Sequence, residues 1–152
     1  MIIGSLGENM IYKSNSLKET ENIAKAFAKT LKAGDVVCLN GDLGAGKTAF
    51  TADLAKALGI KDTVSSPTFT IVNCYSGDIP LYHFDLYRIT DCDEVYDIGF
   101  DEYIAGDGIT VIEWADIVSD ILPKERYDIT ITKNLDIHDD YREISVEKRG
   151  TV

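Results

Sequence analysis

The residues whose types and spacing most clearly predict chemistry form one glycine-rich stretch, Gly41-Asp42-Leu43-Gly44-Ala45-Gly46-Lys47-Thr48. It fits the pattern G-x-x-x-x-G-K-[ST], in which backbone N–H groups surround the phosphates of a nucleotide. Glycines permit a positive φ and let the backbone approach the phosphates. Lys47 is expected to reach the outer phosphates, and the Thr48 hydroxyl to bind Mg²⁺. The stretch therefore predicts a nucleotide-binding loop (the P-loop); the alternative is a glycine-rich turn that carries Lys-Thr by chance.

The segments on either side of the P-loop are those that such a loop requires. Residues 35–40 form a short apolar run typical of a strand, and residues 47–58 place Phe50, Leu54 and Leu58 on one face of a helix. In a strand–loop–helix unit, the loop amides and the helix N-terminus point at one anion. We therefore expect the loop to bind phosphate.

A second informative run ends in an acid. Residues 109–112 are four strand-forming residues followed by Glu113, a pattern that predicts a buried parallel strand beside the strand of the P-loop. Ligands of open α/β sheets lie off the carboxyl ends of the strands. Glu113 is therefore the expected acid near Thr48 and its Mg²⁺, with Asp116 as the weaker candidate.

A predicted hairpin carries another acid. Residues 68–75 and 80–86 read as two antiparallel strands joined by a turn at 76–78. His83 and Asp85 are two positions apart, so they point to the same face of the second strand. From this pattern alone, Asp85 either orients a water or a water of the metal, or it forms a structural pair with His83, or the two lie on an exposed edge face.

The rest of the chain supplies supporting elements. Residues 63–67 form a small polar segment that either responds to the terminal phosphate or is an ordinary loop. The remaining patterns predict a short strand at 10–12, a helix opened by the capping box Ser16–Glu19 and ended at Gly34, short acidic helices within 91–106, a short amphipathic helix within 117–126, and an antiparallel strand pair at 127–133 and 143–148.

Length, composition and charge limit the class of protein. The 152 residues, 45% of them hydrophobic, predict one domain, residues 1–152, without a membrane span or a secretion signal. The net charge of −11 argues against direct binding of nucleic acid. Three widely spaced cysteines form neither a disulfide framework nor a metal motif, which suits the cytoplasm.

The identity of the nucleotide follows from missing patterns. The sequence contains no Asp-x-x-Gly and no Asn-Lys-x-Asp, so a GTPase is not expected and ATP is favoured. The alternative enzyme class is a P-loop small-molecule kinase. Such a kinase would need an arginine-rich lid, whereas the middle of this chain is acidic and the whole chain contains four arginines (Arg88, Arg126, Arg142 and Arg149).

Four blocks in the same order resemble the TsaE (YjeE) family, small bacterial ATPases required to make threonylcarbamoyl-adenosine (t6A) in tRNA. The blocks are Gly41–Thr48, Ser66–Phe69, His83–Arg88 and Ile112–Asp116, and the resemblance covers roughly residues 14–148. It implies a P-loop NTPase-like α/β fold: a mixed sheet flanked by helices on both faces, in a three-layer sandwich.

The resemblance also implies roles for single residues. Ser65–Thr68 looks like the nucleotide-responsive switch of the family, Asp85 corresponds to its acid near the γ-phosphate, and Glu113 to its acid on the Mg²⁺ side. The residues expected to act are Lys47, Asp85 and Glu113 in catalysis, Thr48 and Glu113 at the metal, and Gly41, Asp42, Leu43, Gly44, Ala45, Gly46, Lys47, Thr48, Ser66, Thr68 and Trp114 at the nucleotide. Residues 16–20 are a further candidate for the adenine pocket.

The resemblance implies protein partners. Family members act on the TsaD–TsaB pair, which performs threonylcarbamoyl transfer, and hydrolysis of ATP·Mg²⁺ drives a conformational step in that complex. Because no arginine finger is evident in the sequence, hydrolysis by the protein alone is expected to be slow. An acidic protein that reaches tRNA through partners agrees with the net charge.

Overall fold

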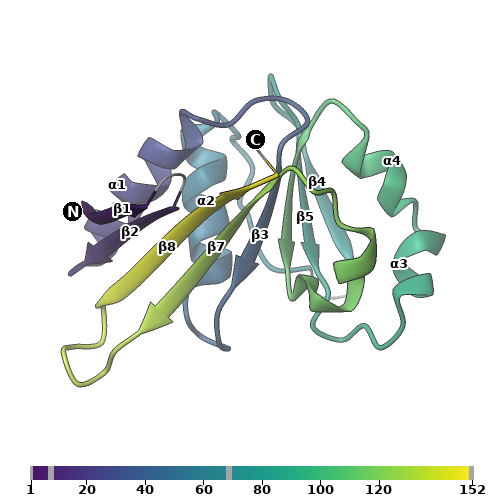
Figure 1. Ribbon diagram of the computed structural model, residues 1–152. Helices are drawn as coiled ribbons and strands as arrows, with labels where there is room; N and C mark the ends of the chain where they lie inside the picture. The colour runs from purple at the N-terminus through teal and green to yellow at the C-terminus, as the bar shows by residue number, and fades with distance from the viewer. Residues whose placement is uncertain (1, 7–8, 68–69, 151–152) are drawn as a thin grey trace.

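The computed structural model describes residues 2–6, 9–67 and 70–150, which form a mixed eight-stranded sheet between two layers of helices (Figure 1). The sheet order is β1-β2-β8-β7-β3-β6-β5-β4. The strands are β1 Ile2–Leu6, β2 Asn9–Ser14, β3 Val36–Asn40, β4 Val72–Tyr75, β5 Leu81–Asp85, β6 Ile109–Glu113, β7 Arg126–Lys133 and β8 Arg142–Arg149. The helices are α1 Leu17–Ala28, α2 Lys47–Ala57, α3 Cys92–Asp97, α4 Phe100–Ile104 and the 3₁₀ helix η1 Ala115–Ile121.

The centre of the sheet is parallel. Strand β3 pairs in parallel with β6 and β7, and β6 pairs in parallel with β5. Every residue of β6 is buried, as expected for a strand covered on both faces. The register sets Glu113 opposite both Leu39 and Asp85. The two predicted acids therefore end neighbouring strands at the edge of the sheet from which the P-loop leaves β3.

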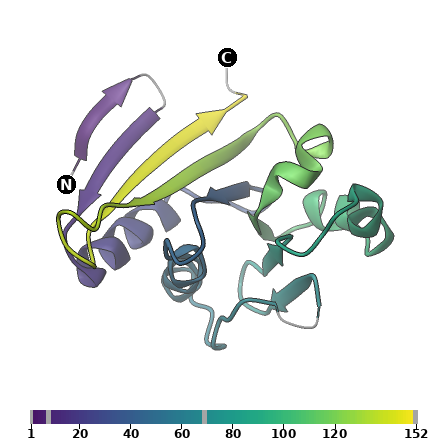
Figure 2. The same cartoon turned by 90° about the horizontal axis from the view of Figure 1, so that it is seen from below.

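Each face of the sheet is covered by its own apolar cluster. Helices α1 and α2 pack Phe27, Phe50 and Leu54 against one face. The short helices α3, α4 and η1 pack Val95, Phe100 and Val118 against the other (Figure 2). The predicted three-layer α/β fold, with helices on both faces of a mixed sheet, is confirmed.

Helix α1 begins where the capping box predicts. The Ser16 hydroxyl accepts a hydrogen bond from the Glu19 N–H at 3.0 Å, and the Glu19 carboxylate accepts one from the Asn15 N–H. The helix ends at Ala28, before the predicted stop at Gly34. The Thr30 hydroxyl donates to the Phe27 carbonyl at 2.7 Å and so competes with the helical backbone bonds of the last turn.

Other predicted elements are shorter or shifted. The first hairpin strand, predicted over 68–75, is β4 from Val72 because residues 70 and 71 form a bend; residues 68 and 69 lie outside the described residues. The helix predicted within 117–126 is η1, which begins directly after Trp114 and ends before Pro123. Strand β1 was not predicted. Both antiparallel pairs, β4–β5 and β7–β8, are confirmed.

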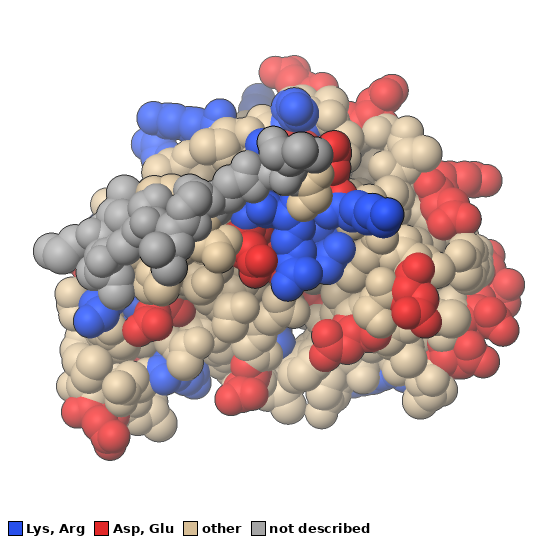
Figure 3. Space-filling model, viewed as in Figure 1, with Lys and Arg blue, Asp and Glu red and all other residues tan. Residues whose placement is uncertain are grey.

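Charge is unevenly spread over the surface. Acidic side chains dominate around α3 and α4, whereas lysines and arginines gather near the middle of the face in Figure 3. At the end of β8 that lies far from the P-loop, Arg126 and Arg149 both pair with Asp128, at 3.0 and 2.5 Å.

Within the described part of the chain, no helix has the length and apolarity needed to cross a membrane.

Candidate functional site

The P-loop adopts a backbone that its glycines make possible. Gly41 has φ +151°, and a Cβ at this position would lie 2.6 Å from the Ile131 carbonyl oxygen. Gly46, at the N-cap of α2, has φ +104°, and no side chain accepts a hydrogen bond from the first amides of the helix. A helix N-terminus without a side-chain cap has N–H groups available for an anion. The local structure is therefore the one that the glycine pattern predicts.

Lys47 is a confined cation at this helix start. Its Nζ donates to the Gly41 carbonyl at 2.5 Å and lies 3.6 Å from the centre of the Trp114 ring. The residue is 5% exposed, and burial lowers the pKa of Lys47, while the nearby carboxylates of Glu113 and Asp85 act in the opposite direction. A poorly hydrated ammonium at a helix N-terminus is suited to bind an anion.

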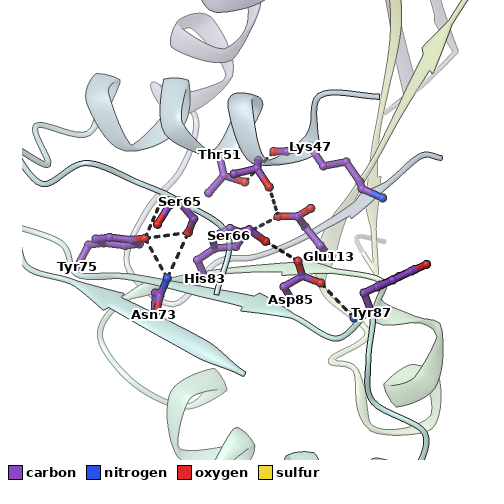
Figure 4. A network of polar contacts seen from close by, with 11 residues as sticks. Lys47, Thr51, Ser65, Ser66, Asn73, Tyr75, His83, Asp85, Tyr87 and Glu113 are labelled. Atoms are coloured by element: carbon purple, nitrogen blue, oxygen red, sulfur yellow. Dashed lines mark hydrogen bonds and ion pairs between the residues drawn. The ribbon is translucent and has the colours of Figure 1, made fainter. Parts of the chain in front are cut away.

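Thr48 and Glu113 meet across 65 positions of sequence. The Thr48 hydroxyl donates to Glu113 Oε2 at 3.2 Å. His83 Nε2 lies 2.5 Å from the same oxygen (Figure 4). Glu113 is 3% exposed and His83 is fully buried. A hydroxyl and a carboxylate are oxygen donors that Mg²⁺ prefers, and the hydroxyl oxygen keeps a lone pair for a metal while its proton binds Glu113. The pair therefore fits the predicted metal site.

Asp85 ends β5 beside Glu113 and is held from two sides. The Ser66 hydroxyl donates to its Oδ2 at 2.6 Å, and the Tyr87 backbone N–H donates to its Oδ1 at 3.1 Å (Figure 4). These bonds fix the direction of the carboxylate. They also bring Ser66, from the predicted switch segment, to the same edge of the sheet.

A cavity of about 280 Å³ lies where these elements converge. The predicted residues on its walls are Leu43, Gly44, Gly46, Lys47, Thr48, Ser66, Asp85, Glu113 and Trp114. The predicted contacts Gly41, Asp42 and Ala45 instead line a neighbouring cavity of about 220 Å³ between the loop and β7. Asp116, the weaker acid candidate, is exposed on η1 and does not line either cavity. The predicted contact Thr68 lies outside the described residues.

The candidate adenine region lies beside the loop. A cavity of about 340 Å³ is bordered by Leu17 and Thr20 of α1 and by Gly46 and Arg142. Its position next to the start of α2 agrees with the predicted contribution of residues 16–20, which stays a prediction.

Trp114 has an unusual backbone. It is the non-glycine residue with positive φ, +58°, among the described residues, and it separates β6 from η1. Its ring contacts Tyr87, with 5.0 Å between ring centres, as well as Lys47. A large residue in the left-handed region is strained, and such strain is common at functional sites. This conformation places Trp114 on the wall of the 280 Å³ cavity, beside Lys47.

Sequence reasoning missed two cations that contact the P-loop from the β7–β8 hairpin. Arg142 donates from Nε to the Ala45 carbonyl at 2.8 Å. Lys133 Nζ lies 3.3 Å from the point that a Cβ of Gly44 would occupy. The hairpin itself was predicted. Its pairing with β3 brings these side chains to the loop, and no local sequence pattern predicts that pairing.

Comparisons with known proteins identify the family of the chain. The family model "Threonylcarbamoyl adenosine biosynthesis protein TsaE" matches residues 14–144. Two curated relatives are named tRNA threonylcarbamoyladenosine biosynthesis protein TsaE. The one from Bacillus subtilis is 50% identical over 134 residues (88% of this chain, 82% of the relative), and the one from Treponema pallidum is 41% identical over 133 residues (88% and 96%).

A solved structure has a similar fold. The crystal structure of YdiB from Bacillus subtilis superposes with a TM-score of 0.75 at 38% identity, and covers 99% of this chain and 88% of that one. The family model spans the P-loop, both acids and the strands that carry them. By these matches, the chain belongs to the TsaE family.

Proposed function

We propose that the protein binds and hydrolyses ATP in the 280 Å³ cavity, with Thr48 and Glu113 as the residues that would hold Mg²⁺. The observation that carries the proposal is the hydrogen bond between these two side chains, made next to Lys47 at the start of α2. The metal would neutralise charge on the phosphates. The loop amides and Lys47 bind and orient the phosphates, and most of the catalysis is electrostatic stabilisation of a loose phosphoryl transition state.

Asp85 orients the attacking water or a water of the metal. Its carboxylate is fixed by Ser66 and by the Tyr87 N–H, and it stands beside Glu113 in the sheet register. Because both of its oxygens accept hydrogen bonds from the protein, Asp85 is suited to position a water rather than to rotate during the reaction.

Hydrolysis by the protein alone is expected to be slow. Among the described residues, no arginine lines the 280 Å³ cavity. Arg142 approaches the loop from the neighbouring side and donates to the Ala45 carbonyl. A stimulated rate therefore requires groups from a partner, as in other P-loop NTPases that receive a charge in trans.

We further propose that the protein acts in t6A modification of tRNA, in the cytoplasm, through TsaD–TsaB. The names of its relatives support the pathway. Two large apolar side chains on the walls of the cavity support a protein partner: Leu43 is 64% exposed and Tyr87 is 53% exposed. With a net charge of −11 and several basic side chains already paired with acids, the protein is not expected to bind tRNA alone.

The test is ATP hydrolysis with and without purified TsaD–TsaB. We expect the complex to raise turnover, and Asp85→Ala and Glu113→Ala to abolish the stimulated rate. Asp116→Ala is the matched control, because this exposed acid lies three residues after Glu113 and outside the cavity. Stimulated turnover in the Glu113 variant at the wild-type rate would refute the proposed site.

One observation favours the second candidate, a small-molecule kinase. A cavity of about 370 Å³ adjoins the first and shares Ser66, Asp85 and Tyr87 with it, so a second substrate has room beside Asp85. A kinase would consume ATP faster with a small hydroxylated compound in the absence of any protein partner. A screen of such compounds that leaves turnover unchanged would exclude this candidate.

A further inference from the structure

The proposed mechanism uses Glu113 but leaves its closest contact without a role. His83 lies on β5, is fully buried, and places Nε2 2.5 Å from Glu113 Oε2 (Figure 4). Its other ring nitrogen, Nδ1, is buried and has no hydrogen-bond partner in the described part of the chain. A buried polar side chain with one strong contact and one unpartnered atom has a defined orientation.

The contact identifies a ring nitrogen that carries a proton. A carboxylate is an acceptor, so the contact with Glu113 requires a proton on Nε2. His83 therefore donates from Nε2–H to Glu113.

The two donors act on the same carboxylate oxygen. Thr48 Oγ1 and His83 Nε2 both donate to Oε2, and no described residue donates to Oε1. Two donors on one oxygen fix the rotation of the carboxylate and leave the other oxygen for the cavity. A buried carboxylate needs hydrogen-bond donors to hold it in one orientation.

We propose that His83 is a positioning residue for Glu113: its Nε2–H orients the carboxylate so that the free oxygen faces the Mg²⁺ side of the cavity. The inference rests on the proposed function and extends it. A purely structural His83 would fill space between β5 and the core, and any side chain of similar volume would then serve equally well.

Two substitutions separate these roles. His83→Gln keeps an N–H donor at a similar reach, and His83→Leu keeps an apolar volume but removes the donor. ADP binding is measured through the fluorescence of Trp114, the single tryptophan of the chain, first in EDTA and then in a Mg²⁺ titration. Thermal unfolding of each variant shows whether the fold is retained.

We expect both variants to bind ADP in EDTA like the wild type. In His83→Leu the apparent Mg²⁺ affinity should fall about 10- to 100-fold, the range found when a group that orients a metal ligand is lost. His83→Gln should lose clearly less Mg²⁺ affinity than His83→Leu, because it restores the donor. An unchanged Mg²⁺ affinity in His83→Leu, or an equal loss in both variants, overturns the inference.

A spectroscopic measurement covers the case in which His83→Leu does not fold. The imidazole ¹⁵N spectrum of the wild type contains two histidines, and His83→Gln identifies the signals of His83 by their loss. The Nε2–H tautomer is expected at His83, and an Nδ1–H tautomer overturns the inference. A wild type that shows no Mg²⁺-dependent nucleotide binding refutes the proposed function itself. A wild type that binds normally, with an unchanged Mg²⁺ affinity in His83→Leu or an equal loss in both variants, refutes the role of His83 alone.

Discussion

Arg142→Gln should loosen the P-loop without changing a residue that is expected to contact phosphate. The Arg142 guanidinium donates from Nε to the Ala45 carbonyl at 2.8 Å, and from Nη1 to the carbonyls of Asp139 and Tyr141 at 2.7 and 2.8 Å. The bond to Ala45 spans 97 positions of sequence and joins β8 to the loop. Losing it removes the restraint that holds the loop against the sheet.

The structure sets the expected magnitude. A hydrogen bond from a charged donor contributes about 1.5–3 kcal/mol, so the free energy of unfolding should fall by about 2 kcal/mol. For a chain of this length, that corresponds to a decrease in Tm of about 4–8 °C. If about 1.4 kcal/mol of the loss lies in ordering the loop, the Kd for nucleotide rises about tenfold.

The assay is isothermal titration with ADP, together with thermal unfolding. Arg149→Gln is the matched control, because Arg149 lies at the opposite end of β8 and pairs with Asp128. Arg142→Lys keeps the charge without the planar donor geometry, so it should lose most of the affinity as well. Full affinity in Arg142→Gln would refute the restraint, and full affinity in Arg142→Lys would show that charge alone is responsible.

Three other substitutions test the same framework. Gly41→Ala should abolish nucleotide binding and lower Tm, because its Cβ would lie 2.6 Å from the Ile131 carbonyl oxygen; normal ADP affinity in calorimetry would contradict the close approach. Lys47→Ala should lose nucleotide binding yet leave Tm unchanged or raised, because burial already lowers the pKa of this lysine and disfavours its charge; a clear drop in Tm would count against that reading. Burial raises the pKa of Cys38 from 9.0 to about 12, so the unfolded chain loses this thiol proton first and stability falls as pH rises through that window. In denaturant unfolding, the free energy of unfolding of the wild type should fall by about 1.4 kcal/mol by pH 10 through this thiol, and Cys38→Ala should not show this loss. Equal pH dependence in the two proteins would exclude a contribution from Cys38.

The parts of the site that come from local pattern were predictable. The glycine spacing identifies the loop, and the apolar run ending in Glu113 predicts a parallel strand whose carboxyl end meets that loop. The alternation on β5 correctly places His83 and Asp85 on one face. Thr48 and Glu113 converge for a general reason, since the ends of neighbouring parallel strands share one edge of the sheet.

The parts that depend on pairing between distant strands were not predictable. Arg142 and Lys133 reach the loop because β7 pairs with β3 and β8 pairs with β7. No pattern within the sequence of the hairpin predicts the pairing of β7 with β3. The left-handed backbone of Trp114 is likewise imposed by its surroundings, because a tryptophan has no local preference for it. The contact between His83 and Glu113 follows from the register of β5 with β6, which a single sequence does not set.

A crystal structure with Mg²⁺ and a non-hydrolysable ATP analogue tests the central claim most directly. We expect the β- and γ-phosphates on the amides of residues 44–48, the metal bonded to the Thr48 hydroxyl, and Glu113 and Asp85 directed at the metal and its waters. A triphosphate bound elsewhere, or a metal held without Thr48 and Glu113, would contradict the proposed site.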